Sequence, residues 1–172
     1  MTTDADGQFF LHVNTIILRC KEWAVNSEYN PVRASAQRTL FKSMDPEAVK
    51  EFKEKEIEDA RADIRLCVLT LSFLRQLCEG HNGTMQDMLR DQSDLNRFSY
   101  NLIHTVTSFV VQLTASTEKF RYMSIPQREL LVNLMDFLVE VCQGPCPENQ
   151  AVVGSLELLA GCKTMLTARV DP

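Results

Sequence analysis

Two stretches of sequence decide the fold of this chain: FLRQLCEGHNGTMQ at residues 73–86 and FLVEVCQGPCPENQ at residues 137–150. Aligned without gaps, they carry Phe, Leu, Cys, Gly and Gln at five equivalent positions. Each copy predicts an apolar helix that ends at a cysteine, a glycine cap, a polar turn and a glutamine that begins the next helix. The members of this repeated motif are Cys78, Gly80, Gln86, Cys142, Gly144 and Gln150.

The repeat predicts an all-α fold, a solenoid of stacked helical hairpins of the armadillo or HEAT kind. One such unit cannot bury its apolar face alone, so neighbouring units stack side by side. The two copies lie farther apart than the ~40 to 47 residues usual in these repeats. We expect an inserted loop around TASTEKFRYMS to account for the difference. No segment shows the period-two alternation typical of strands.

The first 63 residues are expected to form N-terminal helices that pack on a solenoid made by residues 64–172. Apolar residues at steps of three and four predict a first helix. Its buried face comprises Phe9, Val13, Ile16, Cys20 and Trp23 or Ala24. A capping residue followed by proline predicts two further helix starts, Asn30-Pro31 and Asp45-Pro46. The second of these begins one long helix, or a kinked pair, that runs to Cys78.

Further helix start and stop signals divide the predicted solenoid into separate helices. Thr84 with Asp87, and Ser124 with Gln127, have the spacing of capping boxes at helix starts. Between them, an apolar pattern from Phe98 to Leu113 predicts another helix. Helical sequence after the second motif is divided by Pro147 and Gly154 and ends near Arg169.

Composition excludes several classes of protein. The formal net charge is −5 and the basic residues are scattered, which argues against a nucleic-acid-binding surface. No apolar run reaches the ~20 residues of a membrane-spanning helix. The polar start MTTDADGQ does not resemble a signal peptide, so we expect a cytoplasmic protein. Its six cysteines are then expected to be reduced, and most of them to be buried on helix faces.

Two glutamates stand where a helix disfavours negative charge. Glu79 lies in the last turn before Gly80, and Glu140 lies in the last turn before Gly144. The negative end of the helix dipole penalises a carboxylate there by ~0.3 to 1 kcal/mol. Stacking of the two repeats would bring both carboxylates to one place, together with His81 and Gln143. Such oxygen ligands suit calcium, although two carboxylates are few for an ion that takes ~6 to 8 oxygens. The alternative is two exposed glutamates that merely tolerate their positions.

Other chemistry fits the motifs less well. Cys78, His81, Cys142 and Cys146 could be written as a split zinc site, but they would have to bridge two helices whose axes lie ~8 to 10 Å apart. Cys78 and His81 could be written as a nucleophile and its base, but no orienting acid or oxyanion turn is evident. We therefore do not expect an enzyme.

The two motifs closely resemble the domain associated with the homology region shared by ryanodine receptors and inositol trisphosphate receptors. Members of that family read like LCENHN followed by LQNFLR, and later TEYCQGPC followed by ENQ. Here the corresponding segments are LCEGHN followed by MQDMLR, and VEVCQGPC followed by ENQ, with Gly80 in place of the usual asparagine. The resemblance extends over about residues 64–166.

This resemblance implies a cytosolic regulatory module of a calcium-release channel, on the cytosolic face of the endoplasmic reticulum, whose partners are other domains or subunits of the channel. It implies that the solenoid couples ligand and calcium sensing to gating. By motif, the two glutamates that such channels supply to their activating calcium site fall on Glu79 and Glu140, with His81 and Gln143 as supporting residues. A weak or incomplete Ca²⁺ site would follow, since no pore or completing domain is evident here. The alternative is a stand-alone helical-repeat adaptor that binds proteins through its surface and binds no ion.

Overall fold

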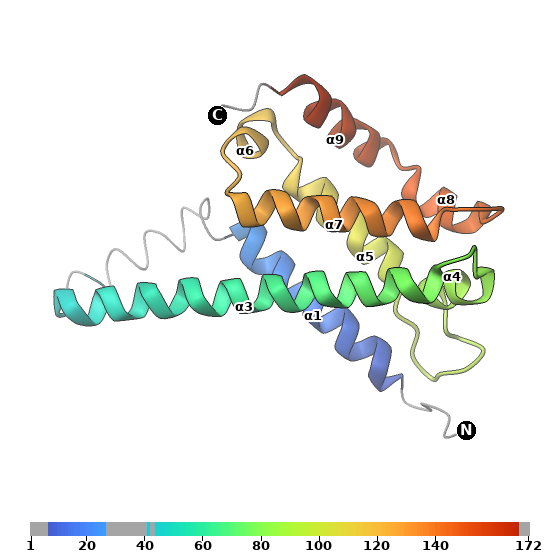
Figure 1. The fold of residues 1–172 in the computed structure, drawn as a ribbon, viewed down its shortest axis with the longest axis horizontal. Coiled ribbons are helices and arrows are strands. Elements are labelled where there is room, and N and C mark those ends of the chain that lie inside the picture. The colour runs from blue at the N-terminus through green and yellow to red at the C-terminus, as the bar shows by residue number, and fades with distance from the viewer. Residues whose placement is uncertain (1–6, 27–40, 42–43, 169–172) are drawn as a thin grey trace.

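The computed structural model describes residues 7–26, 41 and 44–168, and within them the chain is all helical. The predicted all-α solenoid is confirmed: neighbouring helices pack on one another in the arrangement of Figure 1. The second predicted helix, which starts at Pro31, lies outside the described residues. The described helices are α1 (Gln8–Asn26), α3 (Pro46–Cys78), α4 (Gly83–Arg90), α5 (Leu102–Leu113), α6 (Thr117–Arg121), α7 (Ile125–Val141), α8 (Pro147–Val153) and α9 (Leu156–Thr167).

The helices that carry the two motifs, α3 and α7, lie side by side and run in the same direction (Figure 1). Apolar side chains of α3 and α7 pack against each other and against α1 and α5. The fully buried ones include Leu71, Leu74, Leu134 and Phe137. An ion pair from Arg75 Nη1 to Asp136 Oδ2, 3.2 Å long, also joins α3 to α7. Partly exposed pairs contribute about 0 to 1 kcal/mol, whereas burying one leucine contributes about 1.5 to 3 kcal/mol. Apolar packing therefore holds the two helices together.

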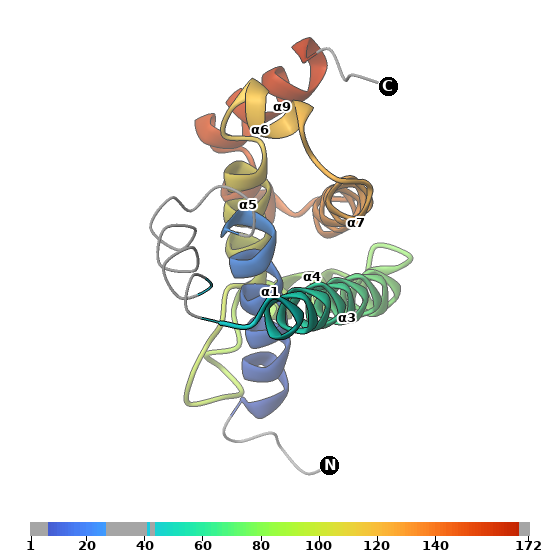
Figure 2. The ribbon, with the colours of Figure 1, turned by 90° about the vertical axis from the view of Figure 1, so that its left-hand side faces the viewer.

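One continuous core includes α1. Viewed from the side, α1 and α5 form a layer that packs against α3 and α7 (Figure 2). The predicted face of α1 is confirmed at Val13, Cys20 and Ala24. It was wrong by one residue at two positions, because Phe10 and Ile17 are buried where Phe9 and Ile16 were expected. Helix α3 runs without a break through residues 63 and 64. The predicted division of the chain into N-terminal helices (residues 1–63) and a solenoid (residues 64–172) stays a prediction. Buried members of this core are Phe10, Val13, Ile17, Cys20, Ala24, Ile64, Cys67, Leu71, Leu102, Ile103, Val106, Phe109, Val110, Leu130, Leu134, Phe137 and Val141.

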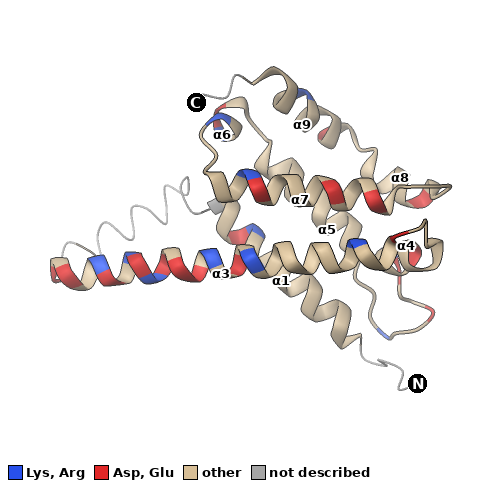
Figure 3. Cartoon of the chain, in the orientation of Figure 1, with Lys and Arg blue, Asp and Glu red and all other residues tan. Residues whose placement is uncertain are grey.

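The first half of α3 extends beyond the other described helices and carries dense charge of both signs (Figure 3). Asp45 caps it, because its carboxylate accepts a hydrogen bond from the Glu47 amide at 3.2 Å. The buried residues of α3 begin only at Ala60. Phe52 and Ile57, the large apolar residues before that point, are about half exposed, at 49% and 52%. The pattern predicted a single helix or a kinked pair, and the structure has a single helix.

Helix starts agree with the sequence in part. The capping box of Ser124 and Gln127 is present. Thr84 was the wrong cap for α4, because the Asn82 side chain accepts the hydrogen bond from the Met85 amide at 3.3 Å and the helix begins at Gly83. Phe98 does not begin α5; Asn101 caps that helix through the His104 amide at 2.8 Å. The segment expected to be an inserted loop contains the short helix α6.

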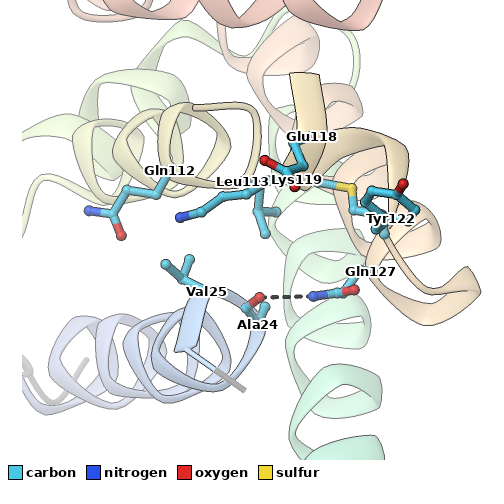
Figure 4. A pocket seen from close by; sticks show the side chains of 9 residues that line it. Ala24, Val25, Gln112, Leu113, Glu118, Lys119, Tyr122 and Gln127 are labelled. Carbon is cyan, nitrogen blue, oxygen red and sulfur yellow. Dashed lines mark hydrogen bonds between the residues drawn. The ribbon is translucent and has the colours of Figure 1, made fainter. Parts of the chain in front are cut away.

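The start of α7 is tied to the end of α1. Gln127 Nε2 donates a hydrogen bond of 2.9 Å to the main-chain oxygen of Ala24, across 103 residues of sequence. Figure 4 shows this bond at the edge of a small pocket that is also lined by residues of α5 and α6, including Gln112 and Leu113. Among the described residues, no helix has the length and apolar character to span a membrane.

Gly161 lets α9 approach α5 closely. A Cβ atom at this position would collide with the Thr114 hydroxyl. We therefore expect Gly161→Ala to lower the free energy of unfolding in urea by about 1 to 3 kcal/mol, the usual cost of overpacking. Gly83→Ala is the control, because nothing lies within 4 Å of a Cβ at that helical position. It should stabilise the fold by about 0.4 to 1 kcal/mol. Equal effects of the two substitutions would contradict the close approach.

Candidate functional site

The structure brings Glu79 and Glu140 to one pocket. This pocket holds about 320 Å³, lies between the C-terminal ends of α3 and α7, and is lined by Ser72, Arg75, Gln76, Glu79 and Glu140. Parallel packing of α3 and α7 places their C-terminal ends together, and each end carries one of the glutamates. The side chain of Glu79 is exposed and that of Glu140 is half-buried. Two glutamates that are 61 positions apart in sequence thus line the same pocket.

Each glutamate stands beside main-chain carbonyls at a helix end. Glu79 is the C-cap residue of α3, in extended conformation, and Glu140 is the last residue but one of α7. Carbonyl oxygens at a helix C-terminus and carboxylates both repel anions and attract cations. The Gln143 amide donates a hydrogen bond of 3.1 Å to Glu140 Oε2, which holds that carboxylate against the end of α7. Of the two expected supporting residues, Gln143 therefore contacts a candidate ligand.

The positively charged side chain of Arg75 also lines this pocket, which the sequence did not indicate. Arg75 lines the opening one turn before Glu79, and its guanidinium pairs with Asp136. A guanidinium is always protonated at neutral pH and offsets part of the negative charge that a metal ion would meet. No group of three or more metal-ligating side chains is found in the described part of the chain. An ion in this pocket would therefore meet at most two carboxylates and would need most of its ligands from other donors.

His81 lies in the turn after α3, is exposed and does not line the pocket. Its main chain has a φ of 58°, next to Gly80 at 73°, so two successive residues are left-handed. The His81 Cβ lies 3.6 Å from where a Cβ of Gly144 would stand, and Gly144 itself has a φ of 80°. Both motif glycines thus act as the left-handed caps that the repeat predicted. His81 packs the first turn against the second.

Buried amide side chains link the two motifs, and one of them was missed. Gln86, which is 1% exposed, donates through Nε2 to the main-chain oxygens of Glu140 at 3.0 Å and Gln143 at 3.1 Å. Asn149, fully buried, donates to the oxygens of Gln86 at 3.1 Å and Val141 at 2.9 Å. The repeat alignment hid Asn149 because it faces Met85 in the first copy. Its presence in the family-like string ENQ was the available signal.

The two motif glutamines are equivalent in sequence but not in contacts. Both stand at the fourth position of their helices, α4 and α8, so the prediction that they begin those helices was wrong by three residues. Gln150 donates within its own copy, to the oxygens of Cys142 and Gly144, both at 3.2 Å. Gln86 instead reaches the other copy. Of the two glutamines, that of the first copy therefore bonds to the end of α7, while that of the second copy bonds within its own turn.

The motif cysteines are packing and hydrogen-bonding groups. Cys78 and Cys146 are buried and Cys142 is half-buried. The Cys146 thiol donates to Gln86 Oε1 at 2.9 Å. Burial, together with the charges of Glu140 and Cys146, raises the pKa of the Cys78 thiol to about 11. A raised pKa disfavours the thiolate needed by a nucleophile or a zinc ligand. The four residues of the split zinc site, all of them described, do not form a metal-binding group.

Because the Cys78 thiol has a raised pKa, we expect the folded chain to lose stability at alkaline pH. The thiol's pKa in the folded state is above the ordinary cysteine value of 9.0, so its contribution to stability is complete below pH 9 and is lost as the pH rises toward 11. We expect the free energy of unfolding to fall by about 1 to 2 kcal/mol more over this range in the wild type than in Cys78→Ala. Urea titrations at several pH values measure this, with Cys162→Ala, a half-buried thiol, as control. Identical slopes for the wild type and Cys78→Ala would contradict the assignment.

Comparison with known proteins agrees with the motifs on which the resemblance rested. The model of the family described as "RyR and IP3R Homology associated" matches residues 61–166. The inositol 1,4,5-trisphosphate receptor itr-1 of Caenorhabditis elegans is 33% identical over 109 residues, which cover 61% of this chain. The chain spans 4% of that receptor's length. No solved structure matches. The chain belongs to the RyR and IP3R Homology associated family.

Proposed function

We propose that this chain is a regulatory scaffold module of, or derived from, an intracellular calcium-release channel, and that it works without catalysis on the cytosolic face of the endoplasmic reticulum. Family membership and the similarity to an inositol 1,4,5-trisphosphate receptor support this assignment. The module acts through helix packing, coupling ligand and calcium sensing to gating. Its partners are other domains or subunits of the channel, which the solenoid surface contacts.

The same module supplies part of a calcium site through Glu79 and Glu140. The observation that carries this proposal is that both carboxylates line one pocket between the ends of α3 and α7. Carboxylate oxygens are the ligands that calcium prefers, and the nearby helix-end carbonyls add partial negative charge. Gln143 supports the site by holding the Glu140 carboxylate. His81 supports it from further away, by fixing the turn that follows Glu79.

The isolated site is weak because it is incomplete. Calcium takes ~6 to 8 oxygen ligands, and two carboxylates provide at most four. Arg75 places a positive charge in the same opening. The remaining donors come from another part of a channel. Alone, the chain should bind calcium with a dissociation constant of ~10⁻⁴ to 10⁻³ M or weaker.

Titration of the chain with calcium tests the proposal. We expect amide resonances near Glu79 and Glu140 to shift together in an NMR titration, and both Glu79→Gln and Glu140→Gln to weaken binding at least about tenfold, since each removes one of two charged ligands. Glu129→Gln is the matched control, because Glu129 is exposed at the opposite end of the same helix as Glu140. If both site variants titrate like the control, Glu79 and Glu140 do not hold calcium, and a titration without any response favours the alternative of a helical-repeat adaptor that binds no ion.

The charge of Arg75 gives an independent prediction. Replacing it by glutamine removes a like charge from the pocket while keeping a side chain of similar length. We expect Arg75→Gln to tighten calcium binding by about two- to fivefold, with the larger effect at low ionic strength. Lys50→Gln changes the net charge equally at an exposed position near the start of α3 and serves as the control. Equal effects of the two substitutions would show that calcium responds only to net charge.

A further inference from the structure

We propose that Gln86 is a positioning residue that joins the ends of α3 and α7 into one unit and so fixes Glu140 relative to Glu79. Its effect on calcium rests on the proposed function, whereas its mechanical role rests only on hydrogen bonds. Gln86 touches neither carboxylate. It acts on Glu140 through the main chain of α7.

Every polar atom of the Gln86 side chain bonds to the second motif. Nε2 donates to the oxygens of Glu140 and Gln143, and Oε1 accepts from the Cys146 thiol. Carbonyls in the last turn of a helix lack the usual partner four residues later. The Glu140 oxygen accepts instead from the Gln143 main-chain amide at 3.2 Å and from Gln86, which is the donor from outside the turn. With only 1% of its surface exposed, Gln86 has no water to replace these bonds. The last turn of α7 is therefore bonded to α4 at Glu140, and Asn149 of α8 adds a separate bond to the oxygen of Val141.

The other side of the connection runs from α4 to Glu79. Only residues 80–82 separate Glu79 from the start of α4. Asn82 anchors this turn to α3 by two hydrogen bonds. Its main-chain amide donates to the main-chain oxygen of Cys78 at 3.2 Å, and its side-chain Nδ2 donates to the main-chain oxygen of Leu77 at 3.3 Å. Two further bonds join α4 to α8: Asn149 Nδ2 donates to the Gln86 main-chain oxygen, and Arg90 donates to Asn149 Oδ1. A displacement at Glu79 thus moves α4 and, through Gln86, the turn that carries Glu140.

Gln92 offers a matched control. It is also 1% exposed, and it uses both ends of its amide, donating to the oxygens of Met88 and Tyr100 and accepting from the Tyr100 amide at 2.7 Å. All of these partners lie in α4 or in the connection to α5. Gln86→Leu and Gln92→Leu therefore remove similar buried hydrogen bonds, but only the first removes bonds to α7.

The experiment measures transmission between the two ends by NMR on the complete chain. Glu79→Gln is introduced into the wild type, Gln86→Leu and Gln92→Leu, and the amide shift changes of Glu140, Cys142 and Gln143 are recorded. We expect clear shifts in the wild-type and Gln92→Leu backgrounds and at least a threefold reduction of these shifts in the Gln86→Leu background. Both single variants should lower the melting temperature similarly, so loss of stability alone does not produce the difference. If Gln86→Leu does not fold, Gln86→Met, of similar length, takes its place.

Calcium binding gives the second readout. Gln86→Leu should weaken binding at least threefold, and Gln92→Leu should leave it unchanged. Transmission that survives Gln86→Leu, or that is lost equally in Gln92→Leu, would overturn the proposal. If the wild type binds no calcium, the proposed function fails, while the transmission measurement still decides the role of Gln86.

Discussion

Parallel packing of α3 on α7 is the constraint on which the rest of the structure depends. Because the two helices run in the same direction, their C-terminal ends meet, and each end carries a motif with a cysteine, a left-handed glycine and a glutamate. The buried leucines and phenylalanine between the helices fix this register. An antiparallel arrangement would have placed the two carboxylates at opposite ends of the layer. The pocket that contains both exists only because of this direction.

Polar groups at the helix ends convert that packing into a defined geometry. Apolar contacts are not directional, so they bring α3 and α7 together without specifying how the last turns meet. The amides of Gln86, Asn149 and Gln143 provide the directional part, since each donates to the end of α7. Leaving such groups buried without partners costs about 1 to 3 kcal/mol each, which penalises any other arrangement of the turns. The site is thus rigid on the α7 side.

The two copies of the motif make different hydrogen bonds, although their sequences align. In the second copy, Gln150 satisfies carbonyls of its own turn. In the first copy, the corresponding Gln86 satisfies carbonyls of the neighbour and accepts a bond from its cysteine. A symmetric solenoid would repeat the same contacts in each unit. Here one unit braces the other, so the two glutamates differ in environment: Glu79 is exposed beside a short turn, and Glu140 is half-buried and hydrogen-bonded.

The sequence by itself determined the helical class, the two motifs, the glycine caps and the pair of glutamates, because these follow from local periodicity, from backbone conformation and from an alignment within the chain. It could not determine contacts that depend on rotation and register. The buried face of α1 began at Phe10 and not Phe9, and Asn82 replaced Thr84 as the cap of α4, because tertiary packing chose between neighbouring residues of similar propensity. The roles of Arg75 in the pocket and of the buried Asn149 were decided only by the tertiary structure, since their partners Asp136 and Gln86 are 61 and 63 positions away in the sequence.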